Sequence, residues 1–599
     1  MTTTAARAFL ERAARHPHRV AYRLLAAGGA PRDEALTWGQ WADASRRFAA
    51  ALIADGLQPG ESVAILAGTG TLWPIADLGV LLAGGVSVGL YPTSAPTQVR
   101  HVVADCGARF VVTDTREQLA KVLAVRDELP ALHTVIAAES AQPGSVGWDA
   151  WLAHGERELP RVGAEVDRRT AAASPDDTAI LIYTSGSTGE PKGAEISHRC
   201  LLASAESIIG ALGLREDDTT LSFLPFCHAA ERMFGLYTRV VSGMEAALVP
   251  DHTRVWEAAG AYGPTVFGGL PRFYEKAYEA LHAAHLRASG EEREAWDLTL
   301  SLGIARSKLV QARRPVPPSL EAEWRTVGAP FFRRARELFG GRVRRATSGG
   351  APLPAEVAEY LDALGITVLG AYGLTEHLCV AMNRPDEYRF DTAGPAMPGT
   401  EARIAADGEI LIRRGDLSFS GYHGRPKDTA AAWTQDGWLL TGDLGELLPD
   451  GSLRVTGRKK ELIALSTGKK VAPLPIEAAL AEDPWIGQAM LYGEGRKFVS
   501  ALISLRPSML RRWREEDGNG GGHAPDGILR HPDLLNLVQQ AVDRVNARLS
   551  RTEQIRRFVV LGRELTAEDG DLTPTLKLRR GVVAEKYRGE LDALYQTVE

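Results

Sequence analysis

The sequence predicts an α/β protein of more than one domain, with a mostly parallel sheet covered by helices and a small β-barrel or sheet region after it. The chain has 599 residues, which is too long for a single hydrophobic core. Its first half alternates helical and strand patterns, as parallel sheets do. From about residue 383 the pattern changes to short strands separated by many turns. These three observations together predict the fold class.

The individual elements follow from the spacing of apolar residues. We expect helices at 38–56, in the first part of 73–92 and at 98–107, and strands at 62–67, in the last part of 73–92 and at 108–114. A long helical, charge-rich segment is expected at 275–340, with a break at the proline-rich 313–318. Short strands are expected at 408–414 and 451–457.

Composition excludes several classes of protein. The net charge is −6, with 69 basic and 75 acidic residues mixed along the chain, so nothing points to nucleic acid as a partner. Four cysteines are scattered without a CxxC pair, which argues against a disulfide scaffold or zinc ribbon and fits a reducing cytoplasm.

No membrane-spanning segment is expected. The N-terminus lacks the apolar run of a signal peptide. The most apolar stretch, 73–92, contains Asp77 and the pair Gly84–Gly85, and it divides into a helix and a strand rather than a span of about 20 apolar residues. We therefore expect a soluble cytoplasmic protein, which leaves room for transient contact with a membrane surface.

One glycine- and hydroxyl-rich loop, YTSGSTGEPKG at 183–193, directly follows the apolar run AILI. It is not a Walker A loop, because Lys192 follows proline and is followed by glycine where a hydroxyl should stand. Proline favours an extended residue before it, so GEPKG is expected to be a turn, with a helix near 197–212. A Gly/Ser linker is the alternative, but linkers are not usually launched from a buried strand. Hydroxyls and bare amides of this kind can surround phosphates.

This loop resembles the phosphate loop of the adenylate-forming (AMP-binding) superfamily, with Ser187 where threonine is usual. The superfamily comprises acyl- and aryl-CoA synthetases, peptide-synthetase adenylation domains and luciferases. The resemblance implies that the loop binds the β- and γ-phosphates of ATP. The residues it implies for this task are Thr184, Ser185, Gly186, Ser187, Thr188, Gly189 and Lys192.

Two further motifs resemble the adenine and metal sites of this superfamily. SGGAPLP at 348–354 resembles its adenine turn, which implies contacts from Gly349, Gly350, Ala351 and Pro352. GAYGLTE at 370–376 implies that Tyr372 stacks on adenine beside Gly373, that Thr375 approaches the α-phosphate and that Glu376 binds Mg²⁺. Thr184 is the second implied metal contact. One carboxylate plus ATP oxygens suffices for Mg²⁺, which keeps several waters.

The remaining motifs lie near the C-terminus. GWLLTGDLG at 437–445 resembles the ribose motif, with Asp443 accepting from the ribose hydroxyls. TGRKKELI at 456–463 supplies Arg458 for ribose or phosphate and Lys460 at the hinge position, whereas Lys459 is expected to be merely solvated.

Lys577 in LTPTLKLRR at 572–580 matches the catalytic lysine of the superfamily. A carboxylate that attacks a phosphate brings two anions together, and an ammonium between them offsets the repulsion.

Six motifs occur in the superfamily's order across 183–580. The resemblance implies a large domain at 1–457, which binds ATP and the acid, and a small, mobile α+β lid domain at 458–599, which brings Lys577. It implies two half-reactions: MgATP and a carboxylate give acyl-adenylate and pyrophosphate, and coenzyme A then takes the acyl group and releases AMP. Between the two half-reactions, the small domain is implied to pivot near Lys460.

The acid is expected to be a medium- to long-chain fatty acid. The stretches at 89–114, 222–235 and 264–276, the LTP before the lysine and the helical insert at 280–340 resemble long-chain fatty acyl-CoA synthetases. His228, Glu231 and Arg232 match that branch. The acyl-binding candidates are His228, Phe267, Gly268 and Gly269, although core packing explains the last three nearly as well. His377 and Cys379 replace the small residues expected after the YGLTE motif, which puts the chain length in doubt.

Several alternatives stay open. The acyl group could pass to the phosphopantetheine of a separate carrier protein, or to an amine, instead of coenzyme A. The chain could also be a regulatory protein that binds nucleotide without catalysis, although the joint presence of Lys577, Glu376 and Asp443 argues against this. The arginines of the helical insert could bind coenzyme A phosphates or anionic lipid, but the interspersed glutamates favour a solvated face.

Overall fold

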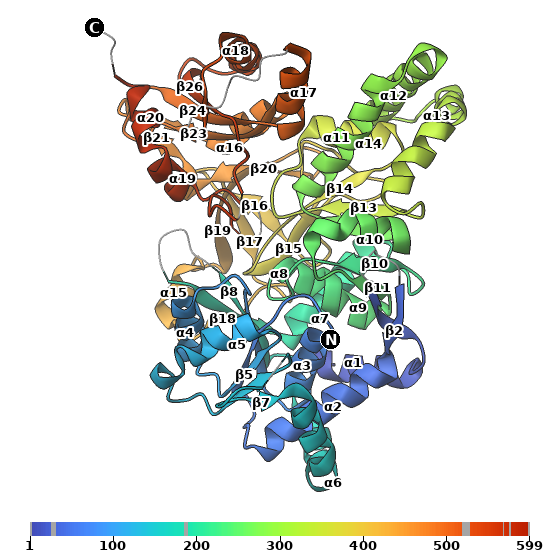
Figure 1. Ribbon diagram of the computed structural model, residues 1–599, viewed down its shortest axis with the longest axis vertical. Coiled ribbons are helices and arrows are strands. Elements are labelled where there is room, and N and C mark those ends of the chain that lie inside the picture. Colours follow the sequence, from blue (N-terminus) through green and yellow to red (C-terminus); the bar gives the residue numbers. More distant parts are fainter. Residues whose placement is uncertain are drawn as a thin grey trace.

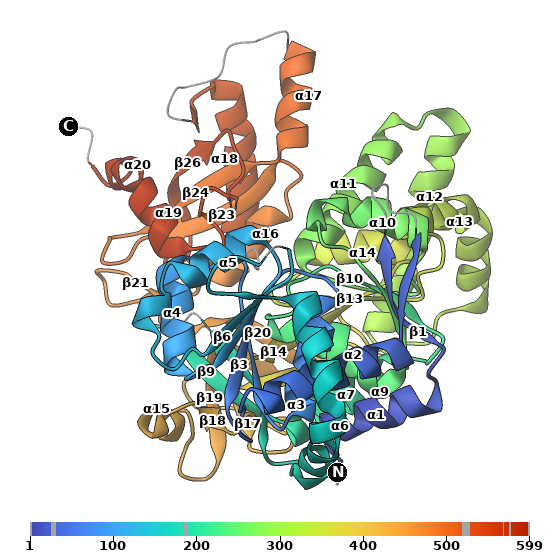
Figure 2. The same ribbon diagram turned by 60° about the horizontal axis from the view of Figure 1, so that its bottom comes forward.

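The computed structural model describes residues 3–25, 31–139, 141–184, 190–517, 527–566, 568–573 and 577–596. In these residues the strands form two eight-stranded sheets, two four-stranded sheets and a two-stranded ribbon. Figures 1 and 2 show the C-terminal elements, orange to red, and a group of green helices as two lobes on the same side of the blue N-terminal region.

The first eight-stranded sheet begins at an antiparallel edge and continues as six parallel strands. Its strands, in spatial order, are β18 (Gly421–Tyr422), β9 (Lys192–Ser197), β8 (Thr178–Thr184), β4 (Val86–Leu90), β3 (Ser62–Leu66), β5 (Phe110–Thr113), β6 (Thr134–Ala137) and β7 (Val146–Gly147). Its helices are α2 (Trp38–Ala54), α3 (Leu72–Leu82), α4 (Pro96–Asp105), α5 (Arg116–Leu123), α6 (Trp148–Ala172) and the 3₁₀ turn η1 (Arg126–Glu128). Strands β3, β4 and β5 are buried along their whole length, as expected of parallel strands covered on both faces.

The second eight-stranded sheet also contains six parallel strands, with an antiparallel strand at each edge. In spatial order the strands are β15 (His377–Met382), β14 (Val368–Leu374), β13 (Arg345–Ser348), β12 (Val266–Gly269), β10 (Thr219–Ser222), β11 (Glu245–Leu248), β1 (Val20–Leu25) and β2 (Pro31–Thr37). The accompanying helices are α1 (Ala5–Arg15), α7 (His198–Leu212), α8 (Ala229–Glu231), the π-helix η2 (Arg232–Tyr237), α9 (Thr238–Ser242), η3 (His252–Arg254), α10 (Val255–Tyr262) and α14 (Ala355–Ala363).

A helical insert projects between the strands β12 and β13. It consists of α11 (Pro271–Arg287), α12 (Gly290–Gln311) and α13 (Pro318–Leu338). Helix α12 ends before the proline-rich stretch, and α13 begins at Pro318, so the predicted helical segment and its break are confirmed.

The region after residue 400 contains an antiparallel sheet of β16 (Ala402–Ile404), β17 (Glu409–Arg413), β19 (Trp438–Leu447) and β20 (Leu453–Arg458). The short helix α15 (Pro426–Ala431) lies between β18 and β19 in the chain. The order β16-β17-β19-β20 is open, so of the two arrangements that the sequence suggested here, the sheet rather than the closed barrel is formed among the described strands.

The C-terminal elements form a separate α+β arrangement with cores of their own. The ribbon is β21 (Ile463–Ala464) and β22 (Lys470–Val471), and the sheet is β23 (Ile486–Tyr492), β24 (Val499–Leu505), β26 (Ile555–Leu561) and β25 (Ile528–Leu529). The helical elements are η4 (Lys459–Glu461), α16 (Pro473–Ala481), α17 (Pro507–Asp517), α18 (Pro532–Asn546), α19 (Arg580–Lys586) and α20 (Arg588–Ala593).

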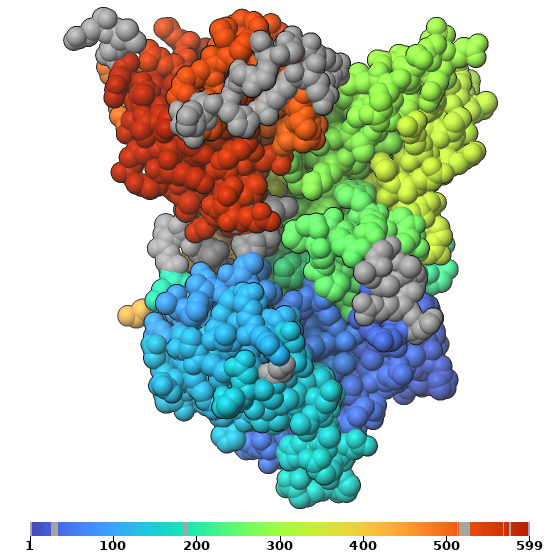
Figure 3. Space-filling model, viewed as in Figure 1, coloured from blue at the N-terminus to red at the C-terminus, as the bar shows by residue number. Residues whose placement is uncertain are grey.

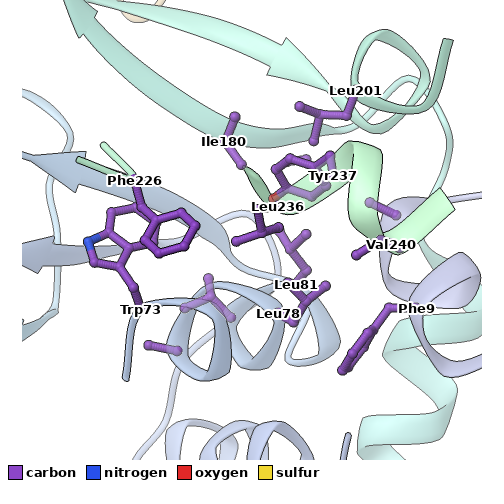
Figure 4. Close-up of a cluster of buried hydrophobic side chains, with 14 of the residues drawn as sticks. Phe9, Trp73, Leu78, Leu81, Ile180, Leu201, Phe226, Leu236, Tyr237 and Val240 are labelled. Carbon is purple, nitrogen blue, oxygen red and sulfur yellow. The ribbon is translucent and has the colours of Figure 1, made fainter. Parts of the chain in front are cut away.

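The largest core joins the two eight-stranded sheets. Figure 4 shows Phe9 of α1, Leu78 of α3, Ile180 of β8 and Tyr237 of η2 pointing into one cluster. The apolar stretch at 73–92 divides into α3 and β4, as the sequence predicts; α3 belongs to this core, whereas Val86, Val88 and Leu90 of β4 belong to a second one. The one charged residue of this stretch, Asp77, accepts a hydrogen bond from the Tyr237 hydroxyl at 2.7 Å and pairs with the fully buried Arg232. Among the described helices none is long and apolar enough to cross a bilayer.

Candidate active site

Four neighbouring parallel strands of the second sheet, β10, β12, β13 and β14, end at one edge. In register, Gly269 lies opposite Ser348, and Ser348 lies opposite Gly370. Ligands of open α/β sheets bind outside the carboxyl ends of the strands. The predicted adenine turn directly follows β13, and the GAYGLTE motif lies on β14. The two motifs therefore converge at this edge.

The predicted adenine turn is the loop between β13 and α14. The Gly349 amide donates to the Gly269 carbonyl at 3.3 Å, which fixes the start of the turn against β12. Gly350 has a φ of +82°, a left-handed conformation that a residue with a side chain rarely adopts. Ala351 and Pro352 continue the turn toward α14. The backbone of this loop is therefore shaped by its glycines, as the motif predicts.

The GAYGLTE motif forms a hairpin. Leu374 pairs with His377, so Thr375 and Glu376 are the two residues of the turn between β14 and β15. A Cβ atom on Gly373 would lie 2.5 Å from the Leu378 carbonyl oxygen, so only glycine fits this position of the hairpin. The two polar residues are presented at the tip of a strand pair.

Glu376 is held by a residue that the sequence motifs do not include. The Tyr422 hydroxyl of β18 donates to Glu376 Oε1 at 2.6 Å. The Lys192 ammonium lies 5.4 Å from the centre of the Tyr422 ring and 2.8 Å from Asp428 Oδ2. Tyr422 thus connects the predicted metal ligand with the lysine of the phosphate loop.

The phosphate loop lies between two antiparallel strands. Thr184 ends β8 and pairs with Lys192, which begins β9. The prediction that Lys192 lies in a turn leading to a helix is therefore wrong in part: a six-residue strand intervenes before α7, which is capped by Ser197. Ser185, Gly186, Ser187, Thr188 and Gly189, and the side chain of Thr184, lie outside the described residues.

Asp443 is buried, and both of its oxygens have partners. Arg458 Nε lies 2.7 Å from Oδ1, and the Tyr372 hydroxyl donates to Oδ2 at 2.6 Å. Burial and the charge of Asp443 raise the pKa of Tyr372 well above its ordinary value. A carboxylate offers about four lone-pair sites, so each oxygen can accept a further donor from a ligand.

Lys577 comes from the C-terminal elements and lies in the same cluster. Its amide donates to Thr573 Oγ1 at 3.0 Å, and its neighbour Leu578 forms a bridge with Leu572. The residue keeps exposed surface, but protein atoms crowd its ammonium. This desolvation, followed by the charge of Arg458, lowers the pKa of Lys577, while Asp443 and Glu461 oppose the shift. The predicted ribose aspartate and the predicted catalytic lysine, far apart in sequence, therefore interact electrostatically.

His228 adjoins this cluster. Its Nδ1 accepts a hydrogen bond from the Ala230 amide at 3.2 Å. Burial, followed by the charge of Lys577, lowers the pKa of His228 to about 4. The imidazole is therefore neutral at pH 7, and because Nδ1 is an acceptor, Nε2 carries the proton.

The other acyl-binding candidates lie on β12. The Phe267 ring is fully buried among aromatic rings: it stacks on Trp256 at 5.6 Å and meets Phe339 edge-on at 5.2 Å. Core packing accounts for this side chain. Gly268 and Gly269 are only partly buried, and a Cβ atom on Gly268 would lie 3.3 Å from Thr347 Oγ1.

Two further residues that the sequence singled out are buried. His377 hydrogen-bonds with Thr400 Oγ1 at 2.8 Å and Ser418 Oγ at 3.2 Å, and burial lowers its pKa to about 4. Cys379 belongs to an apolar cluster with Leu212, among others.

The residues around the predicted hinge form the 3₁₀ turn η4. Lys460 is exposed, as a hinge residue can be. The prediction that Lys459 is merely solvated is wrong, because its ammonium lies 2.6 Å from Asp407 Oδ2 and also pairs with Glu409. Glu461, whose charge acts on the pKa of Lys577, was missed by sequence reasoning. So was Tyr422, whose contact with Glu376 spans 46 residues and leaves no local signal.

Comparison with known proteins identifies the family. Residues 9–423 match the family described as AMP-binding enzyme, and residues 460–599 match the AMP-binding enzyme C-terminal domain. The long-chain-fatty-acid–CoA ligase FadD15 of Mycobacterium bovis is 34% identical over 94% of this chain and 92% of its own length. The Homo sapiens long-chain-fatty-acid–CoA ligase ACSBG1 is 29% identical over 96% of this chain and 83% of its own.

Solved structures show the same fold. An anthranilate CoA ligase in complex with anthranoyl-AMP has a TM-score of 0.73 at 19% identity, and the match covers 98% of this chain and 97% of that one. The adenylation domain of a carboxylate reductase from Mycobacterium chelonae has a TM-score of 0.73 at 24% identity, and the match covers 99% of this chain and 91% of that one. On the family matches and the 34% identical relative, this chain belongs to the AMP-binding enzyme family.

Proposed function

We propose that the protein is an AMP-forming acid–CoA ligase that activates a medium- to long-chain fatty acid. The acid reacts with ATP to give an acyl-adenylate and pyrophosphate, and coenzyme A then takes the acyl group and releases AMP. The observation that carries the proposal is the buried Asp443, which pairs with Arg458 and accepts from the Tyr372 hydroxyl, with Lys577 near enough for the charges of Arg458 and Asp443 to act on its pKa. The names of the relatives, long-chain-fatty-acid–CoA ligases, support the acid and the acceptor.

Lys577 is proposed to act at the reacting atoms. A partly desolvated ammonium interacts more strongly with two anions than a solvated one does, because water screens it less. Placed between the carboxylate of the acid and the α-phosphate, it offsets their repulsion and stabilises the charge that develops. Thr375, at the hairpin tip, is proposed to donate to the α-phosphate.

The remaining polar residues are proposed to hold ATP. Tyr372 and the turn at 349–352 would bind adenine, Asp443 and Arg458 the ribose, and Lys192 with residues 184–189 the β- and γ-phosphates. Glu376 would hold Mg²⁺: a single carboxylate on a rigid hairpin fits a metal that takes one or two carboxylates together with substrate phosphates. When bound, Mg²⁺ would neutralise phosphate charge.

His228, Gly268 and Gly269 are the proposed wall of the acyl site. The neutral imidazole can lie against an alkyl chain without a buried charge, and its Nε2–H can donate to a carboxylate oxygen. The bare glycine backbone at the end of β12 leaves room for the chain, with the aromatic cluster around Phe267 as a rigid support behind it.

The proposed division is a domain at 1–457 and a second at 458–599, with the pivot at Lys460. An exposed Lys460 directly after Lys459, which is anchored to Asp407, supports a hinge at this point.

The experiment is ATP–pyrophosphate exchange with acids of graded chain length. Exchange that increases from acetate to medium- and long-chain acids is expected, and exchange restricted to amino or aromatic acids would contradict the proposed substrate. Coenzyme A, a phosphopantetheinylated carrier protein and amines are then supplied separately after adenylation. Thioester formation with coenzyme A alone is expected.

A further inference from the structure

We infer that two ion pairs between α11 and the C-terminal elements, Arg272–Glu564 and Glu279–Arg506, position Lys577 at the ATP site. They would do so by holding the C-terminal elements against the helical insert. The inference rests on the proposed function for Lys577, and it assigns positioning roles to residues outside the nucleotide site.

The residues on α11 share one face. Arg272, Glu275 and Glu279 are spaced i, i+3 and i+7, which places them above one another along a helix. Arg272 Nη1 lies 3.1 Å from Glu275 Oε2, and its Nη2 pairs with Glu564 of the C-terminal elements. Glu275 thereby steadies the guanidinium that reaches across. Figure 3 shows the orange and red surface of the C-terminal elements meeting the green surface of this region.

Glu564 belongs to the same connection as Lys577, between β26 and α19. It follows β26 and precedes Leu565, whose amide donates to Gln488 Oε1 at 3.0 Å in β23. The stretch from Glu564 to Lys577 is tied to the same sheet through Asp571, which pairs with Arg563 at 2.7 Å and Lys586 at 3.2 Å. Holding Glu564 against α11 therefore also restrains the position of Lys577.

The second pair is more deeply buried. Arg506 Nη1 lies 2.9 Å from Glu279 Oε1, its Nη2 donates to the Ala481 carbonyl at 2.9 Å, and only 4% of its side chain is exposed. Its Nε is buried and has no hydrogen-bond partner among the residues that the structure describes. Removing Glu279 would leave a buried cation without its counter-charge, which is far more unfavourable than losing a surface pair.

Carboxylates on the two sides of this interface also influence one another electrostatically. Burial and the charge of Glu482, after α16, raise the pKa of Glu356 on α14. Burial raises the pKa of Glu482, opposed by Arg548 and reinforced by the charge of Glu359. The charge of Arg506 acts on Glu356 in the opposite direction and lowers its pKa, so the cation of the second ion pair also offsets like charge at this interface.

The test is a charge reversal with rescue. Arg272→Glu, Glu564→Arg and the double variant are compared with Arg254→Glu, which breaks the pair Arg254–Glu257 within one short surface segment. Two rates are measured: ATP–pyrophosphate exchange, and thioester formation from supplied acyl-adenylate and coenzyme A. Thermal unfolding confirms that each variant folds.

Each single reversal is expected to slow exchange about tenfold, the usual effect of one close ion pair at an interface, with thioester formation unchanged. In the double variant the exchange rate is expected to return to within about threefold of the wild-type rate, because the two reversed charges attract each other again and residues in contact are energetically coupled. Glu279→Gln is expected to act in the same direction. Equal slowing of both half-reactions, or no recovery in the double variant, would overturn the inference.

A second readout does not depend on activity. Energy transfer between dyes on cysteines introduced at the exposed Asp149 and Asp533 reports whether the C-terminal elements stay in place. The single reversals are expected to broaden the transfer distribution and the double variant to restore it. If the wild type shows no exchange with any acid, the proposed function fails; a distribution unaffected by the reversals refutes the role of the ion pairs by itself.

Discussion

Asp443 and Arg458 face each other across β19 and β20, with Arg458 Nε 2.7 Å from Asp443 Oδ1. The Tyr372 hydroxyl donates to the other oxygen of this carboxylate, and the charges of Arg458 and Asp443 act on the pKa of Lys577. Four sequence motifs thereby meet around one carboxylate, and its removal affects each of them.

Asp443→Ala is expected to weaken ATP binding by about tenfold to a hundredfold, the effect of losing hydrogen bonds to a charged acceptor. Isothermal titration with ATP measures it. Asp436→Ala, an exposed aspartate of the same sheet region, serves as the control. Unchanged affinity in the Asp443 variant would contradict the ribose role.

Tyr422→Phe removes the hydroxyl that orients Glu376 but keeps the ring beside Lys192. Residues that orient a metal ligand change metal affinity by about tenfold or more when mutated, so the Mg²⁺ concentration for half-maximal exchange should rise about tenfold. Tyr262→Phe, whose hydroxyl donates to Glu245 at 2.7 Å, is the matched control. Equal Mg²⁺ dependence of exchange in the Tyr422 and Tyr262 variants would contradict a role of Tyr422 at the metal site.

Glu231 predicts a pH-dependent stability. Burial raises its pKa from 4.5 to about 7, and the Ser222 hydroxyl and Arg239 oppose the shift. Between these values the folded protein holds a proton that the unfolded chain releases, so stability falls as pH rises from about 4.5 to about 7. As the pH rises over this range, the free energy of unfolding of Glu231→Gln should increase relative to that of the wild type by roughly 3 kcal/mol. This is an upper bound from about 1.4 kcal/mol per pH unit. Denaturant unfolding at pH 5 and pH 8 measures it, and a constant difference would contradict the assignment.

Lys577 predicts the alkaline limit of adenylate formation. The ammonium is the active form, and desolvation with the charge of Arg458 lowers its pKa below 10.5. Raising the pH should therefore abolish exchange before an ordinary lysine would lose its proton. Thioester formation from supplied acyl-adenylate should not share this limit. The pH profiles of the two half-reactions provide the comparison, and superimposable profiles would be evidence against the role of Lys577.

The sequence predicted those parts of the fold and site that depend on local pattern. The stretch at 73–92 separates into α3 and β4 because its spacing and its glycine pair are local signals. The break before α13 is local in the same sense.

Long-range contacts could not be predicted in this way. The strand at Lys192 depends on pairing with β8 and β18, and the anchoring of Lys459 depends on β17. The pair Arg272–Glu564 joins residues 292 positions apart. Nothing near either residue marks such a partner, because the contact arises only once the C-terminal elements pack on α11.

The most direct measurement is the pair of half-reaction rates of Lys577→Ala. The ammonium is proposed to act only while the carboxylate attacks the α-phosphate, so its loss should slow adenylate formation by about a hundredfold or more, as the loss of one preorganised group does. Thioester formation from supplied acyl-adenylate should stay near the wild-type rate. Equal loss in both half-reactions would contradict the account.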